Sequence, residues 1–266
     1  YIATKTGSTT VEGFWKDLET SLNNLKTDYI DIYQFHNPSF CPKPGDGTGL
    51  YEAMLEAKAQ GKIHFIGLTN HRLPVAIEAC ESGLYDTIQF PFSYLADQKD
   101  IDLVNKCKEN NIGFICMKAL SGGLINRSDA AYAYLAQFDN VLPIWGIQKE
   151  SELDEFISYQ TKAPELTQEI QDLIAHDRKE LAGDFCRGCG YCMPCPKGIQ
   201  INQCARMSLM LRRAPAASWL NDHWQAEMKK IEECLNCGKC KQHCPYHLNT
   251  PKLLKKNYED YKTFLK

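Results

Sequence analysis

The sequence predicts an α/β fold, a (β/α)8 barrel with six β/α units visible, followed by a small helical domain. Three observations support this prediction. Short apolar strands alternate with amphipathic helices over residues 1–163. Polar residues recur at the points where the strands end. Residues 164–266 have no strand alternation, yet they contain eight clustered cysteines.

The composition is that of a globular protein with a sizeable core. The 266 residues are 44% hydrophobic and 24% charged, with a formal net charge of −3. This balance does not favour a nucleic-acid binder. No apolar run approaches the roughly 20 residues of a membrane span, and no secretory signal is visible. The clustering of cysteines favours metal ligation in a reducing cytoplasm over disulfides in a secreted protein.

The first three β/α units are defined by helical spacing and by residues that begin or end helices. Trp15, Leu18, Leu22 and Leu25 are spaced to share one face of the first helix. Gly61 closes the second helix, and Pro74 and Gly83 bound the third. We expect strands over residues 1–5, 29–36 and 63–70, and helices over residues 11–26, 49–62 and 74–83.

The next three units continue the same alternation, which implies parallel strands joined by right-handed crossovers. We expect strands over residues 87–92, 112–118 and 141–147, and helices over residues 98–111, 129–138 and 151–160. A barrel is favoured over a doubly wound sheet because no Gly-x-Gly-x-x-Gly turn follows a strand. Barrels also gather reactive groups at the carboxyl ends of their strands. Polar residues at those ends are Lys5, His36, Asn70, Gln89 and Lys118.

The tail is expected to form a separate helical domain over residues 164–266, after a barrel domain over residues 1–163. Helices are expected over residues 164–181, 201–213, 218–233 and 250–266. Two similar cysteine runs lie between these helices, so the domain resembles an internal repeat.

The second cysteine run has the spacing Cys-x2-Cys-x2-Cys-x3-Cys-Pro, which is typical of bacterial ferredoxins. In such proteins the fourth cysteine of a run binds the other cluster. The last gap of the first run is one residue shorter, so the reach of Cys195 is in question. We assign one [4Fe–4S] cluster to Cys186, Cys189, Cys192 and Cys244, and the other to Cys234, Cys237, Cys240 and Cys195.

Structural zinc is the alternative for these cysteines, but zinc sites normally use separated Cys-x2-Cys pairs. Two triplets that each end in Cys-Pro fit that pattern poorly. Cys204 falls within an expected helix, and we interpret it as a packed thiol rather than a ligand.

Six segments in the first 160 residues resemble successive strands of the aldo-keto reductase family. They are IATKTG, DYIDIYQFH, GKIHFIGLTNH, TIQFPFSYL, ICMKALSGG and LPIWGIQKESELDE. The tail resembles the C-terminal iron–sulfur extension of one subgroup. The resemblance implies a barrel that transfers hydride from NAD(P)H to a small carbonyl substrate.

The resemblance also implies a catalytic set of Tyr, Lys, Asp and His, in which Lys5 matches the Lys and His36 matches the His. The Asp and the Tyr belong to two β/α units that we expect upstream of Tyr1. A Lys beside a phenol lowers its pKa, and a His at a strand end can donate to a developing alkoxide. The alternatives are a solvated loop Lys and a core His with satisfied hydrogen bonds.

The nicotinamide cofactor would be held by three sets of residues, again by resemblance. Thr69, Asn70 and Gln89 match the residues at the carboxamide, and Met117 stands where the family usually stacks an aromatic ring. In the pyrophosphate loop, Leu120 and Gly122 are the candidates. At the adenosine end they are Gln148, Lys149, Ser151 and Glu152. Glu152 stands where NADP-preferring members often carry Arg, so NAD and NADP both stay open. Ordinary turn chemistry is the alternative for the loop residues.

The leading hypothesis is an iron–sulfur oxidoreductase with two [4Fe–4S] clusters and NAD(P)H. Clusters carry single electrons whereas NAD(P)H gives two, so a flavin or a docked redox protein is a candidate mediator. The alternative hypothesis is an electron-transfer or redox-sensing protein whose barrel is a scaffold without catalysis.

Overall fold

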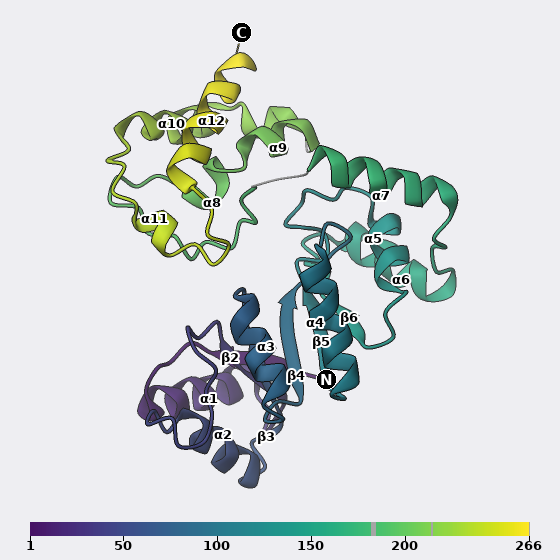
Figure 1. The fold of residues 1–266 in the computed structure, drawn as a ribbon, viewed down its shortest axis with the longest axis vertical. Coiled ribbons are helices and arrows are strands. Elements are labelled where there is room, and N and C mark those ends of the chain that lie inside the picture. The colour runs from purple at the N-terminus through teal and green to yellow at the C-terminus, as the bar shows by residue number, and fades with distance from the viewer. Residues whose placement is uncertain (182–184, 214, 266) are drawn as a thin grey trace. The chain divides into compact units, whose positions relative to one another are not determined.

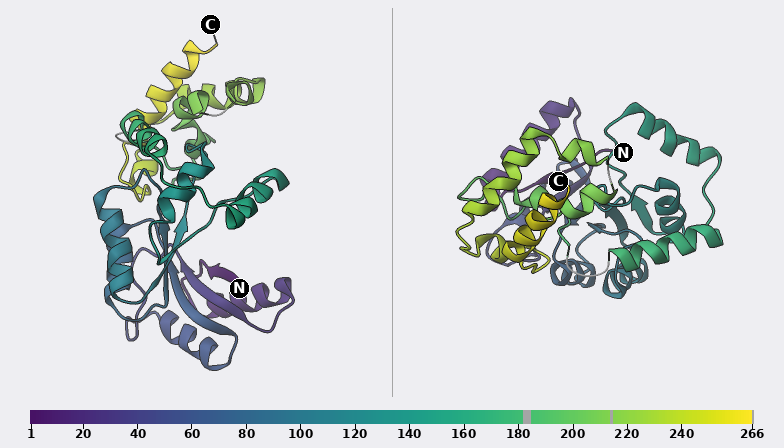
Figure 2. Two further views of the ribbon diagram at one scale, coloured as in Figure 1. Left: turned by 90° about the vertical axis from the view of Figure 1, so that its right-hand side faces the viewer. Right: turned by 90° about the horizontal axis from the view of Figure 1, so that it is seen from above.

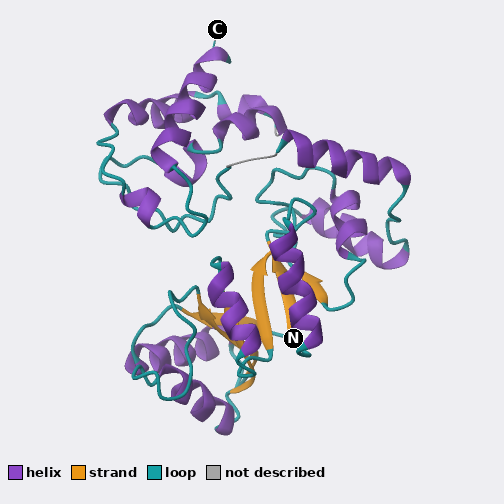
Figure 3. Cartoon of the chain, viewed as in Figure 1, coloured by secondary structure: helices purple, strands orange, loops and turns teal. Residues whose placement is uncertain are grey.

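A computed structural model describes residues 1–181, 185–213 and 215–265, and the chain forms two compact units (Figure 1). The first unit comprises Tyr1–Phe92, Ala96–Met117 and Leu135–Trp145. The second comprises Ser93–Leu95, Lys118–Tyr134 and Gly146–Lys266. The strands belong to the first unit, whereas the second is built from helices and loops (Figure 3). The expected domain boundary after residue 163 stays a prediction.

Six parallel strands form one sheet in the order β1-β2-β3-β4-β5-β6. They are β1 (Ala3–Thr6), β2 (Ile30–His36), β3 (Ile63–Thr69), β4 (Thr87–Pro91), β5 (Gly113–Met117) and β6 (Val141–Pro143). A doubly wound sheet reverses its strand order at a switch point, whereas a barrel adds strands in chain order. The sequential order therefore confirms the predicted barrel type.

The helices of the first unit lie where the sequence predicted them. They are α1 (Val11–Leu25), α2 (Leu50–Ala59), α3 (Leu73–Glu81) and α4 (Gln98–Glu109). Thr10 and Asp97 cap α1 and α4 by accepting backbone N–H groups through their side chains. Of the apolar residues expected on one face of α1, Leu18 and Leu22 are buried, together with Phe14. Trp15 is only partly buried and Leu25 is exposed, because the buried face is centred on Phe14, Leu18 and Leu22.

Alternation along β2 separates the packed face of the sheet from the face that holds polar groups. Tyr33 is fully buried, and its ring lies 5.7 Å from the ring of Phe14 on α1. Gln34 and His36 point to the opposite face because successive strand residues alternate. Phe65, in register with Ile32 on that opposite face, is 47% exposed.

The second unit contains the remaining helices and helical turns. They are α5 (Ser128–Leu135, which ends at the unit boundary), α6 (Glu150–Thr161), α7 (Gln168–Glu180), α8 (Ile201–Cys204), α9 (Met207–Arg213), η1 (Ala216–Trp219), α10 (Asp222–Lys229), η2 (Lys230–Glu233), α11 (Lys239–Gln242) and α12 (Thr250–Thr263). The contacts of α12 are with α8 and α9, among others (Figure 2). No helix in the described part of the chain is long and apolar enough to cross a membrane.

Some expected elements differ from the structure. The helix expected over residues 201–213 is broken, because the Asn257 amide donates to the Ala205 carbonyl (3.1 Å) and accepts from the Ser208 N–H (2.8 Å). The helix expected over 218–233 begins only at Asp222, where the Asn221 side chain caps it. The last strand ends at Pro143 rather than residue 147. The helix expected to end at Lys266 ends at Thr263, and Lys266 lies outside the described residues.

The core of the second unit includes cysteines from both runs. Ile199, Met207 and Leu254 are almost fully buried, and Cys186 and Cys240 belong to the same apolar cluster. The cysteine loops are therefore part of the packing that holds these short helices together.

Candidate functional site

Strand register brings three predicted residues into one row on the first unit. His36 is paired with Thr69, and Thr69 is paired with Gln89, on the neighbouring strands β2, β3 and β4. Lys5 on β1 is paired with Gln34, which lies two residues before His36 on β2. Paired residues of parallel strands point to the same face, so these side chains gather at the carboxyl edge of the sheet.

Lys5 and His36 are close enough to interact electrostatically. Partial burial of the imidazole, and then the positive charge of Lys5, lower the pKa of His36 below its ordinary value. The lower pKa favours the neutral ring, in which one nitrogen is a donor and the other is an acceptor. The N–H of this ring can donate to a carbonyl oxygen.

Gln34 is a site residue that the sequence analysis missed. Its side chain is fully buried and donates from Nε2 to Gln89 Oε1 over 3.1 Å. Its own Oε1 has no hydrogen-bond partner within residues 1–181, 185–213 and 215–265. The signal that could have found it is the alternation that places Gln34 and His36 on one face.

Two of the predicted carboxamide-binding residues, Thr69 and Gln89, donate to the Met117 thioether. Thr69 Oγ1 lies 3.9 Å from Met117 Sδ, and Gln89 Nε2 lies 3.7 Å from the same sulfur. Thr69 is 2% exposed and Gln89 is 5% exposed. The structure thus brings these three residues together in a nearly closed polar cluster, whose role toward a nicotinamide stays a prediction.

Asn70 has a local structural role that accounts for its buried amide. Nδ2 donates to the Pro38 carbonyl over 2.8 Å. Oδ1 accepts from the N–H groups of His71 (2.9 Å) and Arg72 (2.8 Å). The side chain therefore holds the loop after β3 and the entry to α3, and its proposed contact with a cofactor stays a prediction.

The predicted pyrophosphate and adenosine loops lie in the second unit. Leu120 accepts from the Gly123 N–H (3.0 Å), which closes a tight turn. The Glu152 carboxylate accepts from the N–H groups of Gln148 (2.8 Å) and Lys149 (3.1 Å) at the start of α6. These donors, the Gln148 N–H first, lower the pKa of Glu152. Gln148, Lys149 and Ser151 are exposed.

Two cavities in the second unit gather the predicted ligand sets. The cysteines that line the first are Cys186, Cys189, Cys192 and Cys244. Those that line the second are Cys192, Cys195, Cys234, Cys237 and Cys240. Each cavity therefore draws sulfurs from both runs. Cys204 is fully buried and lines neither cavity.

The donor set around each cavity consists of cysteine sulfurs, four in the first cavity and five in the second. Zinc draws four ligands to one point, whereas a cubane binds each thiolate on a different iron. The donor set thus fits [4Fe–4S] chemistry.

The cavity walls are mostly apolar, and the neighbouring backbone supplies N–H donors to sulfur. Burial raises the pKa of Cys186 and Cys189, and burial with the nearby Cys186 and Cys189 raises the pKa of Cys192 to about 12. The Gly188 N–H donates to Cys186 Sγ, and the Lys197 N–H donates to Cys195 Sγ, each over 3.4 Å. Such N–H groups stabilise sulfur ligands of iron–sulfur clusters.

Comparison with protein families gives two matches that do not overlap. The model described as the aldo/keto reductase family matches residues 1–133. The model described as a 4Fe-4S dicluster domain matches residues 185–249, the segment with both cysteine runs.

Comparison with individual proteins gives partial matches to reductases. Methylglyoxal reductase DkgB of Salmonella typhi is 38% identical over 114 residues, which cover 38% of this chain and 40% of that protein. The NADH-specific methylglyoxal reductase of Escherichia coli is 31% identical over 114 residues, which cover 43% of this chain and 35% of that protein. The chain therefore spans less than half of these two relatives.

A solved structure shows the same fold as this chain. The holo form of an aldo-keto reductase from Bacillus halodurans superposes with a TM-score of 0.53 and 20% identity, over 66% of this chain and 70% of that one.

Proposed function

We propose a function from one premise: the chain belongs to the aldo/keto reductase family, whose model matches residues 1–133. The protein is an iron–sulfur oxidoreductase whose barrel reduces a small carbonyl substrate with NAD(P)H. Two relatives are named methylglyoxal reductases, so we propose a small oxoaldehyde as the substrate class. The observation that carries this proposal is the gathering of Lys5, His36 and the Thr69–Gln89 row at one edge of the sheet.

The site residues have separate tasks in this reaction. Bound NAD(P)H supplies the hydride. His36 donates its N–H to the carbonyl oxygen as negative charge develops there. Lys5 is the cation that lowers the pKa of the Tyr acid implied by the family. Its influence on the pKa of His36 supports this placement.

The cofactor contacts follow the same family pattern. Thr69, Gln89 and Asn70 hold the carboxamide, and Met117 packs against the nicotinamide ring through a polarizable thioether. Leu120 and Gly122 cover the pyrophosphate. Gln148, Lys149, Ser151 and Glu152 bind the adenosine end, where the exposure of Lys149 supports contact with a phosphate.

The helical domain carries electrons through two [4Fe–4S] clusters that share ligands between the runs. The cysteines that line each cavity support this assignment. Cys237 is exposed beside Leu235, which is 62% exposed, so electrons would pass to a partner redox protein here. Because clusters carry single electrons and NAD(P)H carries two, a flavin or that partner would have to mediate any exchange of electrons between them. We place the protein in the cytoplasm, because eight cysteines that act as cluster ligands suit a reducing compartment.

The catalytic proposal is tested with the full-length protein purified without oxygen. Lys5→Met and His36→Ala are expected to lower kcat/KM for methylglyoxal at least a hundredfold, because each removes a group that acts on the reacting oxygen or its acid. Lys99→Met, which changes an exposed lysine on α4, is the matched control. Unchanged carbonyl reduction in both site variants would contradict the proposal.

The cluster proposal is tested by counting iron and sulfide and by changing one shared ligand. Cys244→Ser is expected to remove the cluster of the first run and to leave that of the second. Loss of only the second-run cluster would show that the shared ligation is wrong. A colourless protein without iron would reject the clusters altogether.

A second candidate function is electron transfer or redox sensing with the barrel as a scaffold. It is favoured by the bonds that occupy Gln89, Thr69 and Asn70 within the protein itself. A full-length protein with complete clusters that binds neither NADH nor NADPH by fluorescence titration would support this candidate over the first.

A further inference from the structure

Arg206 is a buried cation at the break between α8 and α9. Its side chain donates from Nη1 to the Gly122 carbonyl over 2.8 Å. Nε and Nη2 both donate to Gln203 Oε1, over 3.2 and 3.1 Å. The residue is only 8% exposed, so these contacts replace water around the guanidinium.

Two glycines leave room for this guanidinium. A Cβ atom at Gly122 would lie 2.8 Å from Arg206 Nη1, and one at Gly188 would lie 2.9 Å from the same atom. Gly188 is in the first cysteine run, and its N–H donates to Cys186 Sγ. The charge of Arg206 is therefore packed against the loop that wraps the first cavity.

No carboxylate of the described chain forms an ion pair with Arg206. The two arginines that follow on α9 do have such partners: Arg212 pairs with Asp260, and Arg213 with Asp177 and Glu180. A buried charge is expensive unless an opposite charge compensates it. Burial lowers the pKa of Arg206, and the thiol of Cys186 acts in the opposite direction.

We infer that Arg206 is the charge partner of the cluster held by Cys186, Cys189, Cys192 and Cys244, and that it raises the reduction potential of that cluster. The inference rests on the clusters assigned under the proposed function. Four thiolates give the cluster site a negative charge, and one-electron reduction adds another. A fixed cation in a dry site stabilises the reduced form more than the oxidised form.

The same guanidinium connects the cluster to the predicted cofactor loop. It holds the Gly122 carbonyl, and Gly122 lies in the turn from Leu120 to Gly123. Arg206 is thus a positioning residue that fixes this turn and compensates the charge of the first cluster.

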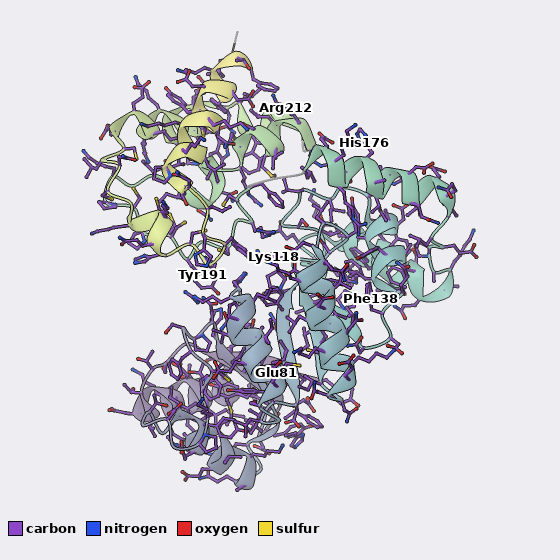
Figure 4. The ribbon with its side chains drawn as sticks, in the orientation of Figure 1. Glu81, Lys118, Phe138, His176, Tyr191 and Arg212 are labelled. Carbon is purple, nitrogen blue, oxygen red and sulfur yellow. The ribbon has the colours of Figure 1, made fainter. Side chains whose placement is uncertain are left out.

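The test is a dithionite titration of the anaerobic holoprotein, followed by electron paramagnetic resonance of both clusters. Arg206→Gln is expected to lower the equilibrium constant for reduction of the first cluster at least tenfold, which is about 59 mV for one electron. The second cluster is the internal control. Arg206→Lys keeps the charge and is expected to restore most of the potential. Arg212→Gln, on an exposed side chain of α9 (Figure 4), is the matched control.

Gln203→Glu tests the charge without removing the arginine. The new carboxylate would replace the amide oxygen that already accepts from Nε and Nη2, so it would pair with the cation in place. The reduction potential of the first cluster is expected to fall in this variant too. The inference is overturned if the Gln203→Glu variant contains full iron and sulfide and the midpoint potentials of its two clusters differ by as much as those of the wild type. Wild-type protein without clusters would instead reject the proposed function.

Discussion

The charge of Lys5 contributes, after burial, to the lowered pKa of His36. Lys5→Met is expected to raise the pKa of His36, because a cation beside an imidazole disfavours its protonated form. Burial still lowers the pKa in the variant, so the value stays below that of an exposed histidine. Titration of the His36 ring protons by NMR measures the change, with Lys99→Met as control. A fall in the pKa would contradict the proposed proximity.

Gly67 allows Gln34 to lie across the sheet. A Cβ atom at Gly67 would lie 2.5 Å from Thr87 Oγ1 and 2.7 Å from Gln34 Cγ. Gly67→Ala is therefore expected to lower the free energy of unfolding by about 1–3 kcal/mol through overpacking. Urea denaturation measures the loss.

Gly113 on β5 supplies the matched control for this substitution. The nearest atom to a Cβ at Gly113 is Thr87 Cγ2 at 3.5 Å, an ordinary contact. Gly113→Ala should therefore be tolerated much better. Equal losses of stability in the two variants would show that the close approach of Gln34 and Thr87 is not the cause.

The α6 helix depends on Glu152 at its first turn. Glu152→Ala is expected to speed hydrogen exchange at the Gln148 and Lys149 amides several-fold, because both lose their acceptor. Glu152→Gln keeps a side-chain oxygen and is expected to retain most of the protection. Exchange followed by NMR distinguishes the two. Equal exchange in Glu152→Ala and the wild type would argue against the cap.

Elements with strong local patterns were predictable from the sequence. The six strands and α1 to α4 follow from apolar spacing and from Gly and Pro at their ends, signals that lie within each segment. The break between α8 and α9 was not predictable in this way. It depends on Asn257, which lies about fifty positions further along the chain. The side-chain amide of Asn257 forms hydrogen bonds with two backbone groups of the expected helix.

The site residues divide in the same way into those that a local sequence pattern predicts and those that depend on distant contacts. Cysteine spacing indicated both ligand sets because the motif is local, and the two cavities gather those sets. Gln34 and Arg206 were missed because their roles come from Gln89 and Gly122, which are distant in sequence. The side chains of Asn70 and Glu152 accept hydrogen bonds from nearby backbone N–H groups. A pattern of residue types does not reveal such bonds.

The two compact units should respond differently to loss of iron. Cysteines form part of the small apolar cluster of the second unit, whereas the sheet has its own buried residues. Chelation of iron is expected to expose residues 185–265 to hydrogen exchange and to leave β2 to β5 protected, because cluster binding contributes to folding of small domains. Mass spectrometry of exchanged peptides measures this. Simultaneous loss of protection in both units would contradict it.

The order of the strands has a consequence for synthesis on the ribosome. Each strand pairs with its neighbour in the chain, so every new β/α unit can dock on the edge made just before it. The two cavities lined by cysteines differ from the sheet in this respect. Each is lined by cysteines from both runs, so neither is complete until both runs have been synthesised. The sheet can therefore form while the chain is still growing, whereas iron–sulfur assembly must wait until Cys244 has emerged. A nascent chain paused between the runs would already have its strands paired but would offer each cluster an incomplete set of thiolates.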